Sequence, residues 1–493
     1  MVCPLTAWPP TILNRSRYIR SYDHIYMMRR ASKLERKSLT QALSEFIYNL
    51  RYSDIPPNVI EKTKIHILDT LGIMMATYDD DNVKKVVNMV RTLGGSEESI
   101  VIGHGFRVAA ANAVIANASM AHSADYDDTH LEPIIHTSCV AVPTALAIGE
   151  AMDIDGKKFV EAIIASYEVS IRIAHAAGRK LHERGFHPTS VVGVFGSVAA
   201  SSKILNLDPS KILNALGIAG SMASGIMQGH KEGIWLKPLH PAIASHSGIL
   251  ASLLAMNGVE GPKMVLEGEW GFFRSYLYGE EPVLNRVVED LGSRWETLNI
   301  AIKPYPVGHA AVAPIDLAIM LREKYSVGLS DIKELVFYLP KTAKDLVCEP
   351  WEKRIRPRNP YEAKFSVPFL AIIAIKKGWV GLRDFTWENI RDEAVLKHTS
   401  KVKCIHDPSY DRVAREAVIP ARVKLLTTDG RIYEEEVINH RGSPKKPFTW
   451  VDEEKKFYEN IANTKFARIG RELVDAIRSI ERHGIRYIGN MLY

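Results

Sequence analysis

The sequence predicts a mainly α protein, in which a large all-helical domain carries a smaller inserted α+β lid domain. Apolar residues recur at every third or fourth position from residue 38 to about residue 298. After residue 301 the pattern changes to short β-rich runs mixed with helices. At 493 residues the chain is also too long for one ordinary hydrophobic core, so two domains are expected.

The predicted helical domain covers residues 38–301. Its amphipathic pattern is clear in one run of apolar residues, namely Val59, Ile60, Ile65, Leu68 and Leu71. Alanine and glycine crowd residues 191–200 and 215–225, where helices must approach closely, either in the core or at a subunit interface.

The predicted α+β lid domain covers residues 302–440. Residues 334–339 (ELVFYL) predict a strand, and Thr427-Thr428-Asp429-Gly430 between two apolar runs predicts a β-hairpin. Residues 441–447 (RGSPKKP) predict a linker, and residues 450–480 return to a helical pattern. We therefore expect residues 441–493 to rejoin the helical domain, with the functional cleft between the two domains.

Residues 1–37 predict a basic extension without fixed structure. They hold eight basic residues and two acidic ones, which leaves 55 of each in the rest of the chain. The folded body is thus electrically balanced, and its pI of 8.8 predicts no nucleic-acid partner. No apolar run approaches a membrane span of roughly 18 residues, so no membrane partner is expected. We expect a cytoplasmic protein, or a mitochondrial one if the basic extension is a transit segment.

The cysteines argue for a reducing compartment. Cys3, Cys139, Cys348 and Cys404 are isolated in the sequence, without a C-x-x-C motif. The same cysteine count argues against an iron–sulfur hydro-lyase, which would need three thiolate ligands gathered around one cluster. Cys139 lies three residues after His136, and we interpret it as a small buried hydrophobe rather than a nucleophile.

The most polar stretch of the chain is residues 122–137 (HSADYDDTHLEPIIHT). It follows a run of small apolar residues, 108–121, that is typical of a buried helix. Buried charges are costly unless they are paired or used in chemistry. If the helix continues to Thr129, then His122, Asp125 and Thr129 share one face and Asp127 points elsewhere. Pro133 would close the helix and a loop would bring His136 back towards that face.

Three interpretations of this stretch compete. The carboxylates and imidazoles could be paired structural groups, they could form a general acid/base site, or Asp125–Asp128 could bind a metal or diphosphate or protonate an alkene. Three other motifs place cations beside prolines: residues 185–190 (GFHPTS), 236–240 (LKPLH) and 302–306 (IKPYP). A basic set of Lys237, Lys303, His136 and His187 favours an anionic substrate over a metal ion.

Phosphate-loop and zinc-protease motifs are absent from the sequence. The four motifs together resemble the MmgE/PrpD family, which includes 2-methylcitrate dehydratase and cis-aconitate decarboxylase. The resemblance extends from about residue 40 to the end, with His136-Thr137 and Ala242 as departures from common family residues. It implies a homodimer that acts without metal or organic cofactor, with a pocket lined by Asp125, Thr129, His136, His187, Lys237 and Lys303.

The resemblance predicts a lyase acting on a small polycarboxylate. Lysines and protonated histidines would neutralise the substrate, His136 or Lys237 would move a proton next to a carboxylate, and Asp125 would orient an imidazole near His136. Dehydration of 2-methylcitrate by a hydro-lyase is the first expectation, and decarboxylation of cis-aconitate by a carboxy-lyase is the alternative. We expect replacement of Lys237 or Lys303 to weaken turnover with little effect on stability.

The sequence gives less support to two functions of other classes. A terpene-cyclase-like enzyme would need an aromatic-lined cavity, which an aromatic content of 8% does not favour. A non-catalytic dimeric binding scaffold would tolerate replacement of both lysines freely.

Overall fold

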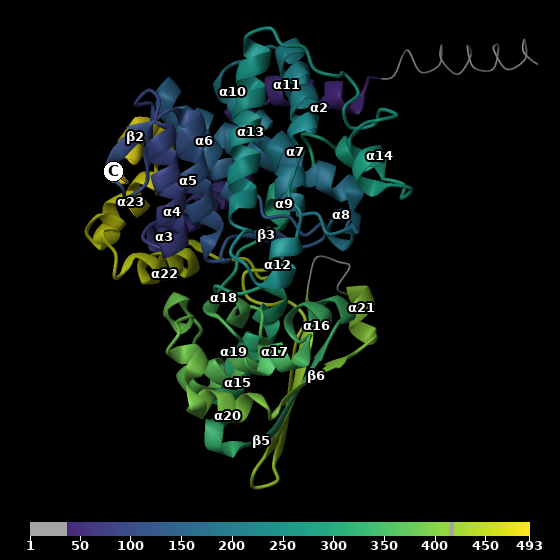
Figure 1. Ribbon diagram of the computed structural model, residues 1–493, viewed down its shortest axis with the longest axis vertical. Coiled ribbons are helices and arrows are strands. Elements are labelled where there is room, and N and C mark those ends of the chain that lie inside the picture. Colours follow the sequence, from purple (N-terminus) through teal and green to yellow (C-terminus); the bar gives the residue numbers. More distant parts are fainter. Residues whose placement is uncertain (1–36, 414–418) are drawn as a thin grey trace, which may run out of the picture.

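The computed structural model describes residues 37–413 and 419–493. The predicted basic extension therefore lies outside the described residues, apart from Lys37. Figure 1 shows a large helical part at the top and a smaller part, drawn in green, below it. The structure is mainly α, which confirms that part of the predicted fold class.

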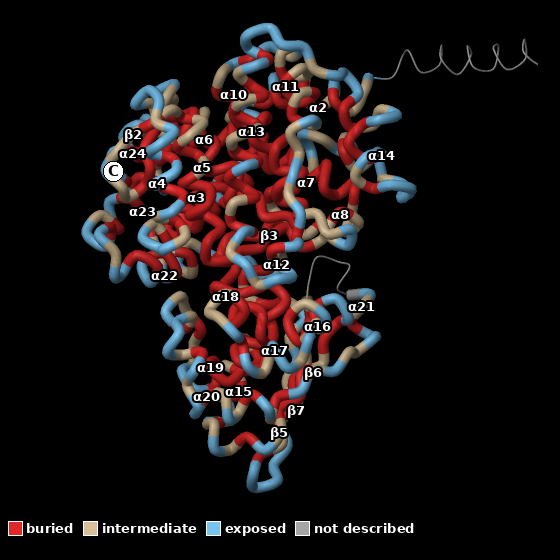
Figure 2. The backbone as a smooth tube through the Cα atoms, viewed as in Figure 1, coloured by how far each residue is buried: buried red, intermediate tan, exposed pale blue. Residues whose placement is uncertain are grey.

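The large part consists of helices packed on one hydrophobic core, drawn red in Figure 2. Its long, buried helices cross one another through small residues, with α13 lying against α5, α10 and α11. The helices of this part are α2 (Leu39–Asn49), α3 (Pro57–Thr77), α4 (Asp81–Leu93), α5 (Ala110–Ser123), α6 (Ser138–Met152), α7 (Gly156–Ala177), α8 (Lys180–Glu183), α9 (Pro188–Val191), α10 (Gly193–Ile204), α11 (Pro209–Met222), α12 (Gln228–Glu232), α13 (Leu239–Met256) and α14 (Phe272–Leu277).

Helix α13 is long and apolar enough, by length and composition, to cross a membrane, contrary to the expectation that no run approaches that length. More than half of its residues are buried against neighbouring helices, as in the core helix of a folded domain. A single helix of this kind is weak evidence for a membrane span.

The smaller part contains a four-stranded sheet in the order β6-β5-β7-β8 and has a second hydrophobic core of its own. Its helices are α15 (Val312–Tyr325), α16 (Lys341–Val347), α17 (Trp351–Ile355), α18 (Pro360–Ala363), α19 (Val367–Lys377), α20 (Glu393–Thr399) and α21 (Ser409–Val413). Its strands are β5 (Ile332–Leu339), β6 (Val402–His406), β7 (Ala421–Thr427) and β8 (Ile432–Val437). Closure of this part as a lid, and the predicted domain boundaries, stay predictions.

The predicted strand and hairpin are present as β5 and as β7 with β8. In the hairpin Leu426 pairs with Ile432, and the turn closes through a hydrogen bond from the Thr427 amide to the Arg431 carbonyl (2.9 Å). Strand β6, which pairs in parallel with β5, was not predicted. It has only five residues, and parallel pairing depends on a crossover that local sequence does not reveal.

The expectation that every cysteine is isolated is wrong for one pair. Cys348, which follows α16, forms a disulfide with Cys404 in β6, with their Cα atoms 6.3 Å apart. The two residues are 56 positions apart in the sequence, and the crossover to β6 brings them together. Cys139 is free and buried, as expected of a small hydrophobe.

The end of the chain returns to the helical part, where the yellow helices lie beside the purple ones in Figure 1. Helix α22 (Trp450–Ile461) packs on α3, and α24 (Ile485–Met491) packs on α6, with α23 (Gly470–Arg478) between them in the sequence. The approach of α22 to α3 is close, because a Cβ added at Gly72 would lie 2.9 Å from the ring of Phe457.

Two short ladders complete the helical part. Strands β1 (Ser99–Val101) and β2 (Phe106–Val108) form a hairpin before α5. Strands β3 (Thr129–His130) and β4 (Ile300–Ala301) pair across a long sequence separation, with Thr129 opposite Ala301. The second ladder places the polar stretch that follows α5 beside the junction with the smaller part.

Candidate functional site

The polar stretch after α5 is not helical as far as Thr129. Helix α5 ends at Ser123, Asp125 has a φ of 52°, and Thr129 lies in β3. The left-handed conformation at Asp125 turns the chain out of the helix, which aspartate tolerates better than most residues. The predicted sharing of one helical face by His122, Asp125 and Thr129 is therefore wrong, although the turn still gathers their side chains.

Asp125 lies between two lysines. The Lys303 ammonium donates hydrogen bonds to the Asp125 carboxylate (Nζ–Oδ1 2.7 Å) and carbonyl (2.8 Å), and Lys237 donates to the same Oδ1 (3.3 Å). All three side chains are at least nine-tenths buried. Burial acts to raise the pKa of the Asp125 carboxyl, but Lys237 and Lys303 hold it well below its usual range. Two buried cations thus share one buried anion, which leaves a surplus of positive charge.

Asp127, which was expected to point away, contacts two histidines. Its Oδ2 accepts a hydrogen bond from His122 Nδ1 (2.7 Å) and lies 3.5 Å from His136 Nδ1. Burial opposes ionisation of the Asp127 carboxyl, but His122 and His136 lower its pKa below the ordinary value. Asp127, and not Asp125, is therefore the carboxylate that contacts the His136 ring.

His136 presents one ring nitrogen to the cavity. Its Nδ1 donates to the carbonyl oxygen of Asp128 (2.8 Å), because a carbonyl can only accept, and Thr129 Oγ1 lies 3.1 Å from the same nitrogen. Nε2 of the neutral ring therefore carries the lone pair. Burial, together with Lys237 and Lys303, lowers the pKa of His136 well below its usual value, so the imidazole is neutral in the free protein.

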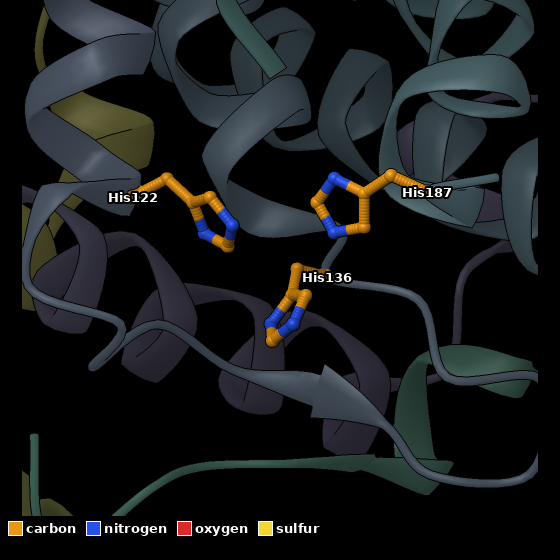
Figure 3. Close-up of side chains that lie close together, drawn as sticks. All are labelled: His122, His136 and His187. Carbon is orange, nitrogen blue, oxygen red and sulfur yellow. The ribbon is translucent and has the colours of Figure 1, made fainter. Parts of the chain in front are cut away.

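His187 precedes α9 and faces the same centre. In Figure 3, His122, His136 and His187 turn their rings towards one another from the end of α5, the loop before α6 and the loop before α9. The rings of His136 and His187 are 6.0 Å apart, and His187 Nδ1 lies 3.0 Å from His240 Nδ1. Its Nε2 has no hydrogen-bond partner among the described residues.

A cavity of about 330 Å³ connects these groups. All six residues predicted for the pocket line it, namely Asp125, Thr129, His136, His187, Lys237 and Lys303. Its wall also includes residues of the smaller part, among them Ala343 and Leu346 of α16 and Phe365. A site lined from both parts matches the cleft expected between them.

Sequence reasoning missed several histidines of the wall. His309 lies in the 3₁₀ turn η4 (His309–Ala311), and its Nε2 is 3.1 Å from His440 Nε2. His182 and His230 also line the cavity, and burial lowers the pKa of each to about 4. None of them lies in the polar stretch, although each lies within six residues of one of the other three motifs, at 185–190, 236–240 and 302–306.

A lysine from the end of the chain supports the site from behind. Lys456 of α22 donates to the carbonyls of Lys303 (2.9 Å) and Tyr126 (3.2 Å) and forms a salt bridge with Asp69 (2.5 Å). Its ammonium also lies 3.8 Å from the centre of the Tyr126 ring. Lys456 therefore ties together the two chain segments that carry Asp125 and Lys303.

The charges around the pocket favour an anion over a metal ion. His122, His136 and His187 could each offer a nitrogen, with the three ligand atoms within 4.8 Å of one another. However, Lys237 and Lys303 face the same space, and their positive charge favours an anion over a cation. The carboxylates of Asp125, Asp127 and Asp128 contact lysines, histidines and Ser138 respectively, so they do not converge on one ion.

The arrangement can bind and act on a small anion with several carboxylates. Two ammonium groups neutralise carboxylate charge, Thr129 offers a hydroxyl, and His136 and His187 offer nitrogens that accept or donate protons. A negative charge that develops on a bound substrate would be stabilised most strongly beside the two lysines.

Comparison with known proteins covers most of the chain. The family model of the MmgE/PrpD N-terminal domain matches residues 41–285, and that of the MmgE/PrpD C-terminal domain matches residues 305–479. Cis-aconitate decarboxylase of Homo sapiens is 27% identical over 461 residues, which cover 90% of this chain and 92% of that protein. The enzyme of the same name from Mus musculus is 26% identical over 460 residues, covering 90% and 91%. That of Aspergillus terreus is 27% identical over 413 residues, covering 80% and 84%.

Proposed function

The chain belongs to the MmgE/PrpD family, and from this premise we propose that it is a carboxy-lyase that decarboxylates cis-aconitate or a close unsaturated tricarboxylate. The relatives named above support decarboxylation over the first expectation from the sequence, dehydration of 2-methylcitrate. The observation that carries the proposal is the buried pair of ammonium groups on one carboxylate, in a cavity where a histidine nitrogen is free.

Substrate binding follows from the charge surplus. A tricarboxylate brings up to three negative charges, and Lys237 and Lys303 together exceed the single charge of Asp125. One carboxylate of the substrate would take the place beside Lys237, whose contact with Asp125 (3.3 Å) is longer than that of Lys303 (2.7 Å). Thr129 would donate its hydroxyl proton to a second carboxylate, because His136 Nδ1 already faces its oxygen.

The bond-breaking step releases carbon dioxide from the carboxylate on the saturated carbon of cis-aconitate. The electron pair of the broken carbon–carbon bond spreads over the neighbouring double bond to the carbon beside another carboxylate. A cation close to that carboxylate stabilises the developing charge, which is the role assigned to the two lysines. No oxidant or reductant is needed, because the electron pair stays on the substrate.

A proton then completes the reaction. Burial and the two lysines hold the pKa of His136 low in the free protein. A bound anion would raise this pKa, so that Nε2 could carry the proton that the carbanion accepts. The double bond moves to the carbon that lost carbon dioxide, and the product is a dicarboxylate with a terminal methylene group. His187, which lines the cavity and whose Nε2 has no hydrogen-bond partner among the described residues, is the second candidate for this proton transfer.

The proposed enzyme is a homodimer. Helix α13 exposes large apolar side chains, with Ile243 at 44% and Leu254 at 39%, which suits contact with a second copy. Light scattering of the purified chain should give twice the mass of one chain, 55.2 kDa. A fully active monomer at micromolar concentration would contradict this part of the proposal.

The test is an assay of the purified protein with cis-aconitate, citrate and 2-methylcitrate, which follows carbon dioxide and alkene absorbance together. Release of carbon dioxide from cis-aconitate, at least tenfold slower in Lys303→Met, is the expected result. A rise of alkene absorbance with 2-methylcitrate and no carbon dioxide would instead support dehydration. No turnover of any acid, in a protein that still binds them, would support a binding scaffold.

A further inference from the structure

A second polar cluster lies behind the pocket, outside its lining. It consists of His130 in β3, His175 in α7 and Glu296 in the 3₁₀ turn η3 (Glu296–Asn299). All three side chains are at least nine-tenths buried. Thr129 and His130 are neighbours in β3, and successive strand side chains point to opposite sides, so Thr129 faces the cavity and His130 faces away from it.

The spacing of this cluster suits metal ligation better than hydrogen bonding. The Nε2 atoms of His130 and His175 are each 3.5 Å from the same oxygen, Glu296 Oε2. In the described part of the chain, none of the four ring nitrogens of the two histidines has a hydrogen-bond partner. Ligands of a tetrahedral zinc ion, with bonds of about 2.0–2.2 Å, lie roughly 3.3–3.6 Å apart. The two buried imidazoles thus lie within ion-pair distance of carboxylates but make no hydrogen bond, and a shared ion would satisfy both of them.

The surroundings complete an ordinary metal-site pattern. Glu132 Oε2 lies 3.4 Å from His175 Nδ1. In many metal sites a carboxylate in this position orients the metal-bound histidine through the ring nitrogen that does not bind the metal. Arg294 donates to the other oxygen of Glu296 (3.0 Å), and Asn299 donates to Oε2 (3.0 Å), so the carboxylate is fixed. The Glu132 side chain is 40% exposed and provides a route from solvent.

We propose that His130, His175 and Glu296 bind one divalent transition-metal ion of the zinc type, with water in the fourth position. The ion would link β3, α7 and η3, three segments that are far apart in the sequence, and so hold the β3–β4 ladder that carries Thr129. It would serve structure rather than the reaction, since its ligands do not line the cavity. The proposal does not depend on the identity of the substrate.

The test measures metal binding by the full chain. Purified protein is stripped with a chelator, dialysed, and titrated with Zn²⁺ and then with Co²⁺ at neutral pH. We expect one ion per chain at micromolar concentration, a visible absorption band typical of four-coordinate Co²⁺, and a higher melting temperature with Zn²⁺. His175→Gln and Glu296→Gln should each weaken the affinity for the ion at least tenfold.

His187→Ala is the matched control, because it removes a histidine from the pocket cluster and leaves the second cluster intact. It should keep the ion and the Co²⁺ band. Loss of the ion in His187→Ala with retention in His175→Gln would assign the metal to the pocket and overturn the proposal. Failure of the unaltered protein to bind Zn²⁺ or Co²⁺ would overturn it as well, and this result needs no variant to fold.

Discussion

At the scale of single residues, Asp125 decides the electrostatics of the pocket. Its backbone has a φ of 52°, and its carboxylate is buried between Lys237 and Lys303. An isolated buried ion costs several kcal/mol, and removal of one partner from a buried pair typically costs 3–5 kcal/mol. The three charges therefore prepare the site for an anion, and their burial leads us to expect that replacement of Lys303 lowers stability as well as turnover.

Replacement of either lysine should lower turnover to a similar extent, but the two replacements should differ in their effect on the stability of the protein. Lys303→Met and Lys237→Met should each lower kcat/KM for cis-aconitate at least tenfold, or about 1.4 kcal/mol, because each removes a cation from the bound carboxylates. Lys303→Met should also destabilise the fold by roughly 3 kcal/mol, since Lys303 is fully buried and makes the shorter contact with Asp125.

Steady-state kinetics and thermal unfolding check this prediction. Addition of Asp125→Asn to Lys303→Met should lower the stability further, because Asp125 still pairs with Lys237 in the single variant and its replacement leaves that buried ammonium without a carboxylate. Lys157→Met, at an exposed position of α7, is the control and should change neither property. Equal stability of the two single variants would contradict the assigned roles of the lysines.

His136 should affect the chemical step more than binding. His136→Gln keeps a polar side chain but cannot carry the proton from Nε2, so kcat should fall at least a hundredfold while KM changes little. Asp127→Asn should mimic it in part, because Asp127 is the carboxylate that contacts the ring. An increase of KM alone in His136→Gln would reassign the proton transfer to His187.

At the scale of elements, the site is assembled by segments that meet far from their places in the sequence. Strand β3 follows α5 and pairs with β4, which directly precedes the segment that carries Lys303. Helix α22, near the end of the chain, contacts the segments next to both strands through Lys456, which donates to the carbonyls of Tyr126 and Lys303. The relative positions of Asp125 and Lys303 therefore depend on an element more than 300 residues away from Asp125.

Lys456 should act as a positioning residue. Lys456→Met removes the contacts to both carbonyls and should lower kcat/KM about tenfold, although the side chain does not line the cavity. In the double variant Lys456→Met/Lys303→Met the two effects on kcat/KM should not add, because Lys456 acts by positioning Lys303, whose ammonium group is already absent. A purely structural role would give additive effects.

The matched control is Lys455→Met on the same helix. Lys455 is exposed, and its ammonium lies 5.5 Å from the ring of Trp379 instead of facing the site. It should leave kcat/KM and the melting temperature nearly unchanged. Comparison of the two variants separates the loss of the Lys456 contacts from the effect of any lysine-to-methionine replacement in α22.

At the scale of the whole molecule, the pocket concentrates histidines that burial keeps neutral. Burial lowers the pKa of His182, His230 and His240 from 6.5 to about 4, and it also holds the pKa of His136, His187 and His309 well below the usual value. The unfolded chain binds protons at these positions from about pH 6.5 downwards, whereas the folded chain does not. Their contribution to stability is thus present above pH 6.5 and is lost as the pH falls towards 4.

Acid should therefore destabilise the protein early. The melting temperature should decrease steadily from pH 6.5 to pH 4. Over this interval the free energy of unfolding should fall by up to about 1.4 kcal/mol per pH unit for each buried histidine. His182→Gln and His230→Gln should each reduce the steepness of this decrease. A melting temperature that is constant over this interval would mean that the histidines take up protons in the folded state.

The sequence by itself determined the helical class, the strand β5, the hairpin of β7 and β8, and the six residues that line one cavity. These features depend on local periodicity, on turn residues, or on motifs that carry the residue types of the site. The concentration of charge next to a buried helix already required a partner for each carboxylate, and that requirement follows from desolvation alone.

Only the tertiary structure decided which side chain each carboxylate contacts. It placed Asp127 on His136, Asp125 on the two lysines, and Lys456 behind them, and it joined Cys348 to Cys404. It also gathered His130, His175 and Glu296, which no local pattern connects. The physical reason is that these contacts form between segments brought together by packing of the whole core, and a single left-handed residue, Asp125, redirects the chain where periodicity alone predicts that the helix continues.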